Sequence, residues 1–232
     1  MKRCLLPLVL ACGCASEARL PASYFAETSE VLAPGKVAVT AVGGGAAQID
    51  GAGYGAGARA RVGVGGGTEV GVEASSSELH TDNYCGIDDC TDTHSKVASH
   101  GAMLSVKTRF RGAAVVAGFG ATRHDLAGGD DDPSADLSGT SLDASIGLVG
   151  DRPLDRDGAI YFGLRLDGAF PVGANPMSVD PLFSAYGALG YTTTTAPLRV
   201  FAEVGPRYAF LASSYGLGEL ALQGVVGVRL VL

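Results

Sequence analysis

Hydrophobic and polar residues alternate along most of the chain, and the stretch from Leu217 to Leu232 shows this most clearly. One of its faces carries Leu220, Leu222, Gly224, Val226, Val228, Leu230 and Leu232. The opposite face carries Glu219, Ala221, Gln223, Val225, Gly227, Arg229 and Val231. Because successive side chains of a strand point to opposite sides of a sheet, the pattern predicts one long strand with an apolar face and a partly charged face.

The same alternation recurs upstream and predicts ten strands in all. They cover residues 36–48, 54–65, 68–79, 98–111, 113–124, 139–150, 158–172, 182–193, 197–210 and 217–232. Most are longer than the five or six residues typical of soluble sheets, and they reach the roughly nine to eleven residues that a membrane-spanning strand needs. The pattern therefore favours an all-β fold, an antiparallel up-and-down transmembrane β-barrel of about ten strands, with eight or twelve as alternatives.

Short and long connections alternate between these strands. Short turns are expected near residues 65–67, 111–112, 151–157 and 194–197, and longer loops at 80–97, 125–138, 173–181 and 211–216. Outer-membrane barrels have short periplasmic turns and longer extracellular loops. An even number of strands also places both ends of the barrel on one side. We therefore expect an outer-membrane location with a periplasmic N-terminus.

Aromatic residues repeat at a spacing that fits the two edges of a membrane. Phe162 and Phe170 lie eight residues apart on one face, and Phe183 and Tyr191 repeat that separation. In tilted strands, eight residues span roughly 20 Å of height, close to the distance between two aromatic girdles. Periodicity alone does not say which face points outward, so a soluble, lipid-anchored barrel that binds a small apolar ligand remains an alternative.

The first residues resemble an export signal. Lys2 and Arg3 precede an apolar stretch that is too short to cross a bilayer as a helix. This stretch ends in two overlapping sequences that resemble a bacterial lipobox, which predicts lipidation of Cys14, with Cys12 as the alternative. An ordinary cleaved signal with incidental cysteines is the other interpretation. The expected organisation is a signal peptide at 1–14, a linker at 15–34 and a barrel at 35–232.

Two further cysteines and the composition narrow the picture. Export implies an oxidising compartment, so Cys85 and Cys90 are expected to form a disulfide within one loop. The chain contains 35 glycines, and each costs about 1 kcal/mol inside a helix, which argues against a helical protein. The net charge of -7 argues against nucleic acid as a partner.

With these features the chain resembles the small outer-membrane β-barrel proteins of Gram-negative bacteria, a class that includes porin-like and adhesin-like barrels of eight to ten strands. The resemblance covers about residues 35–232 and depends on the glycine turn VGVGGGTEVGVE at 62–73 and on the terminal strand. Neither motif is specific to one activity. The resemblance implies a structural or interaction role without enzymatic turnover, no cofactor, and contact with outer-membrane lipid and lipopolysaccharide.

The charged face offers the main candidate site. Facing lipid, each charge would cost about 2–4 kcal/mol near the midplane, so these side chains are expected to point into the lumen. There they would form a plug of paired charges or, as the alternative, line a narrow porin for small solutes. The expected network comprises Arg59, Arg61, Glu69, Glu73, Lys107, Arg109, Asp143, Arg165, Asp167, Arg199, Glu203, Arg207, Glu219 and Arg229.

Histidines and acidic loops are weaker candidates. The histidines are expected at the exposed outer rim, where His124, Asp125 and Ser99 invite comparison with outer-membrane proteases and lipid A-modifying enzymes. We expect them to be solvated polar residues instead, and we expect no enzyme and no resident metal site. The acidic loops could bind Ca²⁺ or Mg²⁺, which prefer oxygen ligands. The residues concerned are His80, His94, His100 and His124, Ser95, and Asp82, Asp88, Asp89, Asp92, Asp125, Asp130, Asp131, Asp132 and Asp136.

Overall fold

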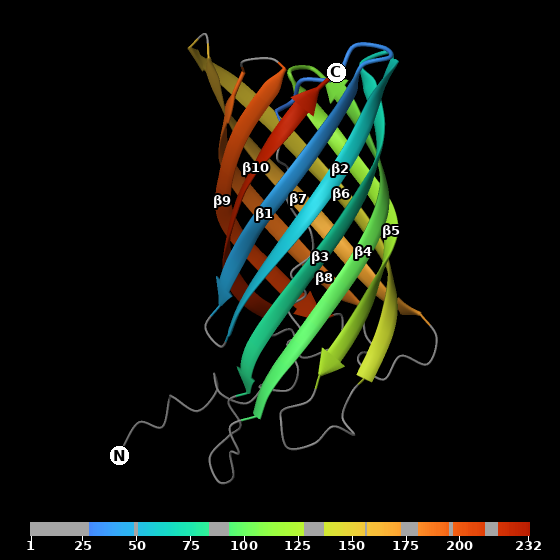
Figure 1. Cartoon of the computed structure of the whole chain (residues 1–232), viewed down its shortest axis with the longest axis vertical. Helices are drawn as coiled ribbons and strands as arrows, with labels where there is room; N and C mark the ends of the chain where they lie inside the picture. Colours follow the sequence, from blue (N-terminus) through green and yellow to red (C-terminus); the bar gives the residue numbers. More distant parts are fainter. Residues whose placement is uncertain are drawn as a thin grey trace, which may run out of the picture.

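A computed structural model of the chain is a closed barrel of ten antiparallel strands (Figure 1). It describes residues 28–48, 51–83, 93–127, 137–155, 157–172, 181–194, 197–211 and 218–232. Within these residues no helix is long and apolar enough to cross a membrane. The strands are β1 (Val37–Gln48), β2 (Gly51–Gly65), β3 (Thr68–Asn83), β4 (Thr93–Phe110), β5 (Ala113–Ala127), β6 (Leu137–Asp155), β7 (Gly158–Val172), β8 (Leu182–Thr193), β9 (Leu198–Leu211) and β10 (Gly218–Val231).

Each strand pairs with its neighbours in sequence, and β10 pairs with β1 to close the barrel. The predicted ten-stranded, up-and-down architecture is confirmed, and the alternatives of eight and twelve strands are wrong. The observed bounds differ from the predicted ones mainly in three strands. β3 runs on to Asn83, β4 already starts at Thr93, and β6 continues to Asp155. Apolar alternation stops in these extensions, but the backbone ladder continues through polar residues, so hydrophobicity underestimates the strand length.

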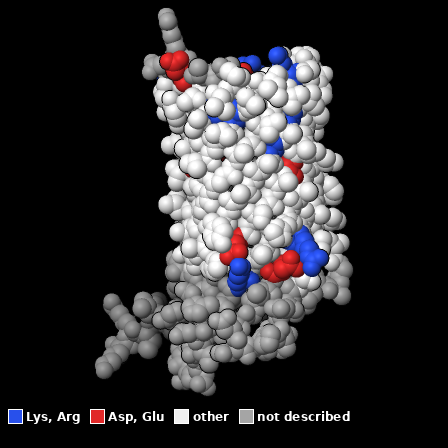
Figure 2. Space-filling view, in the orientation of Figure 1, with Lys and Arg blue, Asp and Glu red and all other residues white. Residues whose placement is uncertain are grey.

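The apolar face of the strands points outward. Leu164, Val200 and Val228 are 55%, 51% and 43% exposed, although all three are large hydrophobic residues. Arg165 and Glu203 point inward and are only 6% and 4% exposed. A soluble barrel would have the opposite arrangement, so that alternative is wrong. On the wall visible in Figure 2 charged atoms are few among uncharged ones, and a group of them lies near the loop end.

The two ends of the barrel differ in their connections. At the end that we call the turn end, β2 and β3 are joined through Gly65, Gly66 and Gly67, whose φ angles of 98°, 60° and 70° favour glycine. Leu232 lies at the same end and pairs with Val37 through two backbone hydrogen bonds of 2.8 and 3.2 Å. The opposite end, where β3 and β4 part, is called the loop end (Figure 1).

Aromatic side chains gather on the outer wall near the loop end of β7, β8 and β9. The ring centroids of Phe170 and Phe183 are 5.8 Å apart, and those of Phe183 and Phe210 are also 5.8 Å apart. Tyr208 extends the group, with its ring centroid 6.1 Å from that of Phe210. Two of them, Phe170 and Phe183, are the residues whose spacing from Phe162 and Tyr191 predicts two aromatic levels. The four rings form the girdle of a lipid-facing barrel on this side.

Candidate functional site in the barrel lumen

Ion pairs line the lumen along β2, β3 and β10. Arg59 Nε lies 2.9 Å from Glu73 Oε1, and Arg61 Nη2 lies 3.3 Å from the same oxygen. Arg61 Nη1 and Arg229 Nη2 lie 3.6 and 3.8 Å from the two carboxylate oxygens of Glu69. All five side chains are buried. They come from inward positions of neighbouring strands, so the alternation of the strands brings charges of opposite sign together.

Aromatic rings fill the other side of the lumen. Tyr161, Tyr186 and Phe201, from β7, β8 and β9, are almost completely buried and pack in one cluster with Val149. The hydroxyls of Tyr161 and Tyr186 donate to the two oxygens of Glu203 at 2.9 and 3.2 Å. The lumen therefore combines a dry aromatic half with an ionic half. The alternation of the strands shows that these residues point inward. It does not show that their rings fill the lumen, because an inward ring alternates in the same way as an inward polar residue.

The chain that precedes β1 enters the lumen at the turn end. Residues 28–32, called the N-terminal plug below, are held there by side chains of the barrel wall. Lys107 Nζ donates to the carbonyls of Thr28 and Glu30 at 2.8 and 2.6 Å. The backbone amide of Ser29 donates to Asp151 Oδ1 at 2.6 Å. The peptide groups of the plug thus provide hydrogen bonds for charged groups that the lumen buries.

Further contacts fix the far end of the plug. The amide of Leu32 donates to Glu69 Oε1 at 2.5 Å, and Glu30 forms an ion pair with Arg199. The hydrogen bond from Arg199 lowers the pKa of the Glu30 carboxyl below its ordinary value of 4.5. Residues 15–34 are the segment expected to be a linker. Those of its residues that the structure describes pack against the barrel, through backbone contacts that leave no hydrophobic period.

Gly63 allows the plug to approach the wall so closely. A Cβ atom on Gly63 would overlap the carbonyl oxygen of Ala33 and lie 2.6 Å from that of Leu32. The amide of Gly63 donates to the carbonyl of Lys36 at 2.9 Å, which fixes the chain as it turns into β1. Any side chain at position 63 would therefore displace the backbone immediately after the plug.

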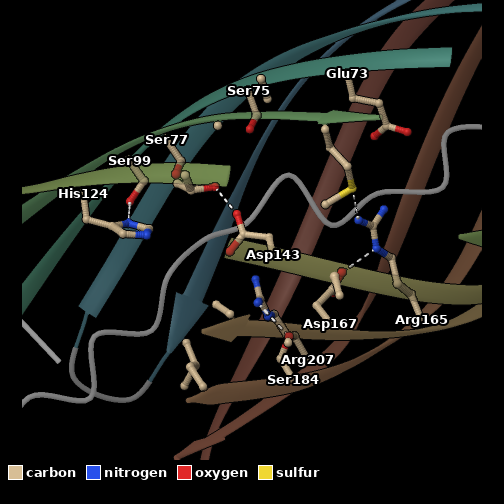
Figure 3. Close-up of a pocket in the computed structure, with 18 residues that line it drawn as sticks. Glu73, Ser75, Ser77, Ser99, His124, Asp143, Arg165, Asp167, Ser184 and Arg207 are labelled. Carbon is tan, nitrogen blue, oxygen red and sulfur yellow. Dashed lines mark hydrogen bonds and ion pairs between the residues drawn. The ribbon is translucent and has the colours of Figure 1, made fainter. Parts of the chain in front are cut away.

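A polar cavity of about 80 Å³ lies in the loop half of the lumen (Figure 3). It has room for roughly five water molecules. In this cavity Arg165 Nε donates to Asp167 Oδ1 at 2.7 Å, and Arg207 Nη2 donates to Ser184 Oγ at 2.8 Å. Its lining includes small hydroxyl side chains from β3 and β4, so the lumen is polar but far less crowded here than at the plug.

His124 belongs to a hydrogen-bonded relay beside this cavity. Ser141 Oγ donates to Asp143 Oδ1 at 2.7 Å, so the His124 Nε2 that lies 3.1 Å from Ser141 Oγ must carry the proton. When the imidazole is neutral, His124 Nδ1 accepts from Ser99 Oγ, which lies 2.8 Å away. The expectation that His124 lies at an exposed rim is wrong, because it is 2% exposed and points inward.

The remaining candidate residues lie on the outer wall, at the turn end, or outside the residues that the structure describes. His80 and His100 are exposed on the outer wall, and Arg109 is exposed at the turn end. In the described part of the chain, no three His, Cys, Asp or Glu residues are grouped to hold a metal ion. The expected lipidation and disulfide cysteines lie outside the described residues, as do the side chains of Glu219 and His94 and the acidic loop residues 82, 88, 89, 92, 130–132 and 136.

Comparisons with known proteins support the fold. No protein family profile and no curated protein sequence matches the chain. The β domain of a Bordetella autotransporter, Brka, is similar in structure, with 15% identity, a TM-score of 0.52, and coverage of 84% of this chain and 98% of that domain. The translocator domain of the Neisseria meningitidis autotransporter NalP has 12% identity, a TM-score of 0.47, and coverage of 86% of this chain and 90% of that domain. An outer-membrane channel of Pseudomonas putida F1 has 9% identity, a TM-score of 0.46, and coverage of 89% of this chain and 99% of that channel. The chain therefore has the fold of Gram-negative outer-membrane β-barrels.

Proposed function

We propose that the protein is an outer-membrane β-barrel with a closed, charged lumen and a structural or interaction role, without enzymatic turnover. One observation carries the proposal: side chains from β3, β4, β6 and β9 bind the N-terminal plug inside the lumen. These strands lie on different sides of the barrel, so the plug is held from around its circumference. A solute entering from the turn end would meet peptide backbone and buried ions.

The narrow porin remains the second candidate function, supported by the polar cavity in the loop half. Two layers oppose it, the plug at the turn end and the ion-pair cluster of Arg59, Arg61, Glu69 and Glu73 on the adjacent strands β2 and β3. Buried ion pairs of this kind are costly to break, by about 3–5 kcal/mol when one partner is removed. Conduction would need both layers to move. We therefore favour a barrel that is silent at rest.

The proposed topology places the turn end in the periplasm and the loop end outside the cell, as in other outer-membrane barrels. Lipidation at Cys14, or at Cys12, is compatible with this arrangement. Residues 15–27 separate Cys14 from the plug, and an extended chain of that length reaches up to about 45 Å. A Cys85–Cys90 disulfide and Ca²⁺ or Mg²⁺ at the acidic loops belong to the same proposal, as features of the extracellular side.

Conductance across a planar bilayer tests this function directly. The full-length protein is inserted from detergent, and heat-modifiable gel mobility with resistance to carbonate extraction verifies that it is a folded, integral barrel. We expect no conductance steps across many verified insertions. Stable, repeated steps from the wild-type protein would exclude a closed lumen and favour the porin. A protein that carbonate extracts from membranes would exclude the transmembrane placement itself.

A further inference from the structure

The lower outer wall carries a group of basic and acidic side chains near the loop end (Figure 2). On β3, β4 and β5 the outward positions are apolar from Val70, Val106 and Val115 as far as Ala74, Ala102 and Ala121. The next outward residues are Ser76, His100 and Arg123. They form one row, because Ser76 is the pairing partner of His100 and His100 is the pairing partner of Arg123. The first polar row beyond the apolar wall, called the basic row below, thus carries two basic residues and a hydroxyl.

Two pairs of basic residues lie at directly opposed positions on the outer wall, one across β3 and β4 and one across β4 and β5. His80 pairs with Lys96 in the ladder, and Glu78 contacts both, 2.7 Å from His80 Nε2 and 2.8 Å from Lys96 Nζ. In the second pair, Arg123 forms an ion pair with Asp125, with 3.1 Å between Nε and Oδ1, and no described carboxylate bridges Arg123 and His100. Directly opposed side chains have Cβ atoms about 4.5–5.5 Å apart, so one anion can accept hydrogen bonds from both residues.

The donors of this second pair are largely unused. Arg123 Nε donates to Asp125 at 3.1 and 3.3 Å, and among the described residues its two terminal amino groups have no partner. His100 likewise contacts no polar partner in the described part of the chain. A guanidinium presents its terminal N–H groups in a planar fork that matches two phosphate oxygens, and a protonated imidazole donates from both nitrogens. This row therefore matches a phosphate group.

An apolar hollow of about 730 Å³ lies on the same part of the wall, nearer the turn end. Val70 and Val72 line it from β3, Leu104 from β4, and Ala117 and Phe119 from β5. From Leu104 to His100 the strand rises about 13 Å. The small outward side chains at 74, 102 and 121 connect the hollow with the basic row. Together they form an amphiphilic surface, with the apolar hollow on the turn-end side of a phosphate-sized set of donors.

The opposite side of the same rim is different. There Phe170 meets Phe183 edge to face and Phe183 stacks on Phe210, and no charged group stands among their outward neighbours on β7 and β8. Aromatic rings of this kind mark the level at which lipid headgroups begin. The basic row lies near the loop end of β3–β5, where β7 and β8 carry aromatic rings instead.

We propose that His100 and Arg123, assisted by the Ser76 hydroxyl, bind the phosphate of an outer-leaflet glycolipid, the lipid A part of lipopolysaccharide, whose acyl chains lie in the hollow on β3–β5. This inference rests on the proposed outer-membrane placement with the loop end outside. It names a site on the barrel for a lipid partner, and it does not depend on whether the lumen conducts.

Binding of purified lipid A to the full-length protein in detergent tests the inference, with native mass spectrometry as the readout. The probes are diphosphorylated lipid A, the same lipid without its phosphates, and inorganic phosphate. We expect the double variant His100→Gln, Arg123→Gln to bind the diphosphorylated lipid about tenfold or more weakly, because charged hydrogen bonds are lost. The matched control is Arg152→Gln, an outward arginine near the turn end, which we expect to bind as the wild type does.

Three results would overturn the site: equal lipid A binding by the double variant, equal binding of the dephosphorylated lipid, or displacement of lipid A by inorganic phosphate at similar concentration. Heat-modifiable mobility of each variant shows that its barrel has folded. Conductance of the same samples separates the two proposals. A folded, silent barrel that ignores the phosphates contradicts the lipid site alone, whereas a conducting barrel that still binds lipid A contradicts the closed lumen alone.

Discussion

Glu69 and Lys107 lie directly opposite each other on β3 and β4, and both side chains are completely buried. Both bind the backbone of the N-terminal plug, Glu69 through the amide of Leu32 and Lys107 through the carbonyls of Thr28 and Glu30. A buried charge is costly unless it is paired or hydrogen-bonded. The plug and the wall therefore stabilise each other, and removing either leaves a buried charge with fewer partners.

Replacing Lys107 with methionine tests this relationship. The variant Lys107→Met keeps most of the side-chain volume but removes two hydrogen bonds to the plug, each worth about 1.5–3 kcal/mol with a charged donor. We expect faster amide hydrogen exchange at Leu32 and a lower free energy of unfolding. Lys36→Met, an exposed lysine at the same end, is the control. If both variants exchange like the wild type, Lys107 does not hold the plug.

A methyl group at position 63 should displace the plug without removing any charge. Gly63→Ala would place Cβ against the carbonyls of Leu32 and Ala33, so we expect a loss of stability of more than about 1 kcal/mol and faster exchange in residues 28–32. Gly224→Ala is the control, because a Cβ there meets nothing within 4 Å. We expect it to be neutral or slightly stabilising. Equal effects of the two substitutions would contradict the close approach at Gly63.

Acid should loosen the plug through Glu30. Its pKa is lowered in the folded protein, so its ion pair with Arg199 stabilises the plug above the ordinary pKa of 4.5. That contribution is lost as the pH falls through the lowered value. The effect should be modest, because the Glu30 side chain is 57% exposed. Hydrogen exchange at the plug, compared with that of Arg199→Gln, measures it. A wild-type pH profile as flat as that of the variant would argue against this ion pair.

The lipid-facing wall should reject charge according to depth. Leu164→Arg places a cation in the middle of the apolar wall, and we expect it to cost about 2–4 kcal/mol. Leu232→Arg, at the turn end, should cost about 0–1 kcal/mol, although the two leucines are similarly exposed at 55% and 61%. Reversible urea unfolding in lipid vesicles measures the two values. Equal costs would contradict a bilayer around the barrel.

Most of the barrel can be predicted from the sequence, because strand alternation has a strict period of two. Arg165 and Glu203 point inward as expected, and Leu164 and Val200 point outward, since a one-residue shift would expose every charge to lipid. The short turn at Gly65 is likewise encoded in the sequence, because the turn needs a positive φ angle and glycine adopts it readily. These features depend on local chemistry, which a single sequence contains.

The plug and the relay at His124 could not be predicted in this way. Residues 28–32 are held through their backbone amides and carbonyls, which every sequence possesses, so no pattern distinguishes them from a linker. His124 shares its parity with inward residues such as Val116, which is the one signal of its burial. That signal is hidden because His124 falls at the end of the apolar alternation, where the strand nevertheless continues to Ala127.

Fluorescence quenching by lipids with brominated acyl chains tests the orientation of the wall most directly. Single cysteines replace Leu164 and Val228 on the outer face and Ser145 on the inner face, in a chain whose natural cysteines are changed to serine, and each carries a small fluorophore. We predict strong quenching at 164 and 228 and little at 145, because lipid tails reach only the outer wall. Quenching at 145 with protected labels at 164 and 228 would contradict the account.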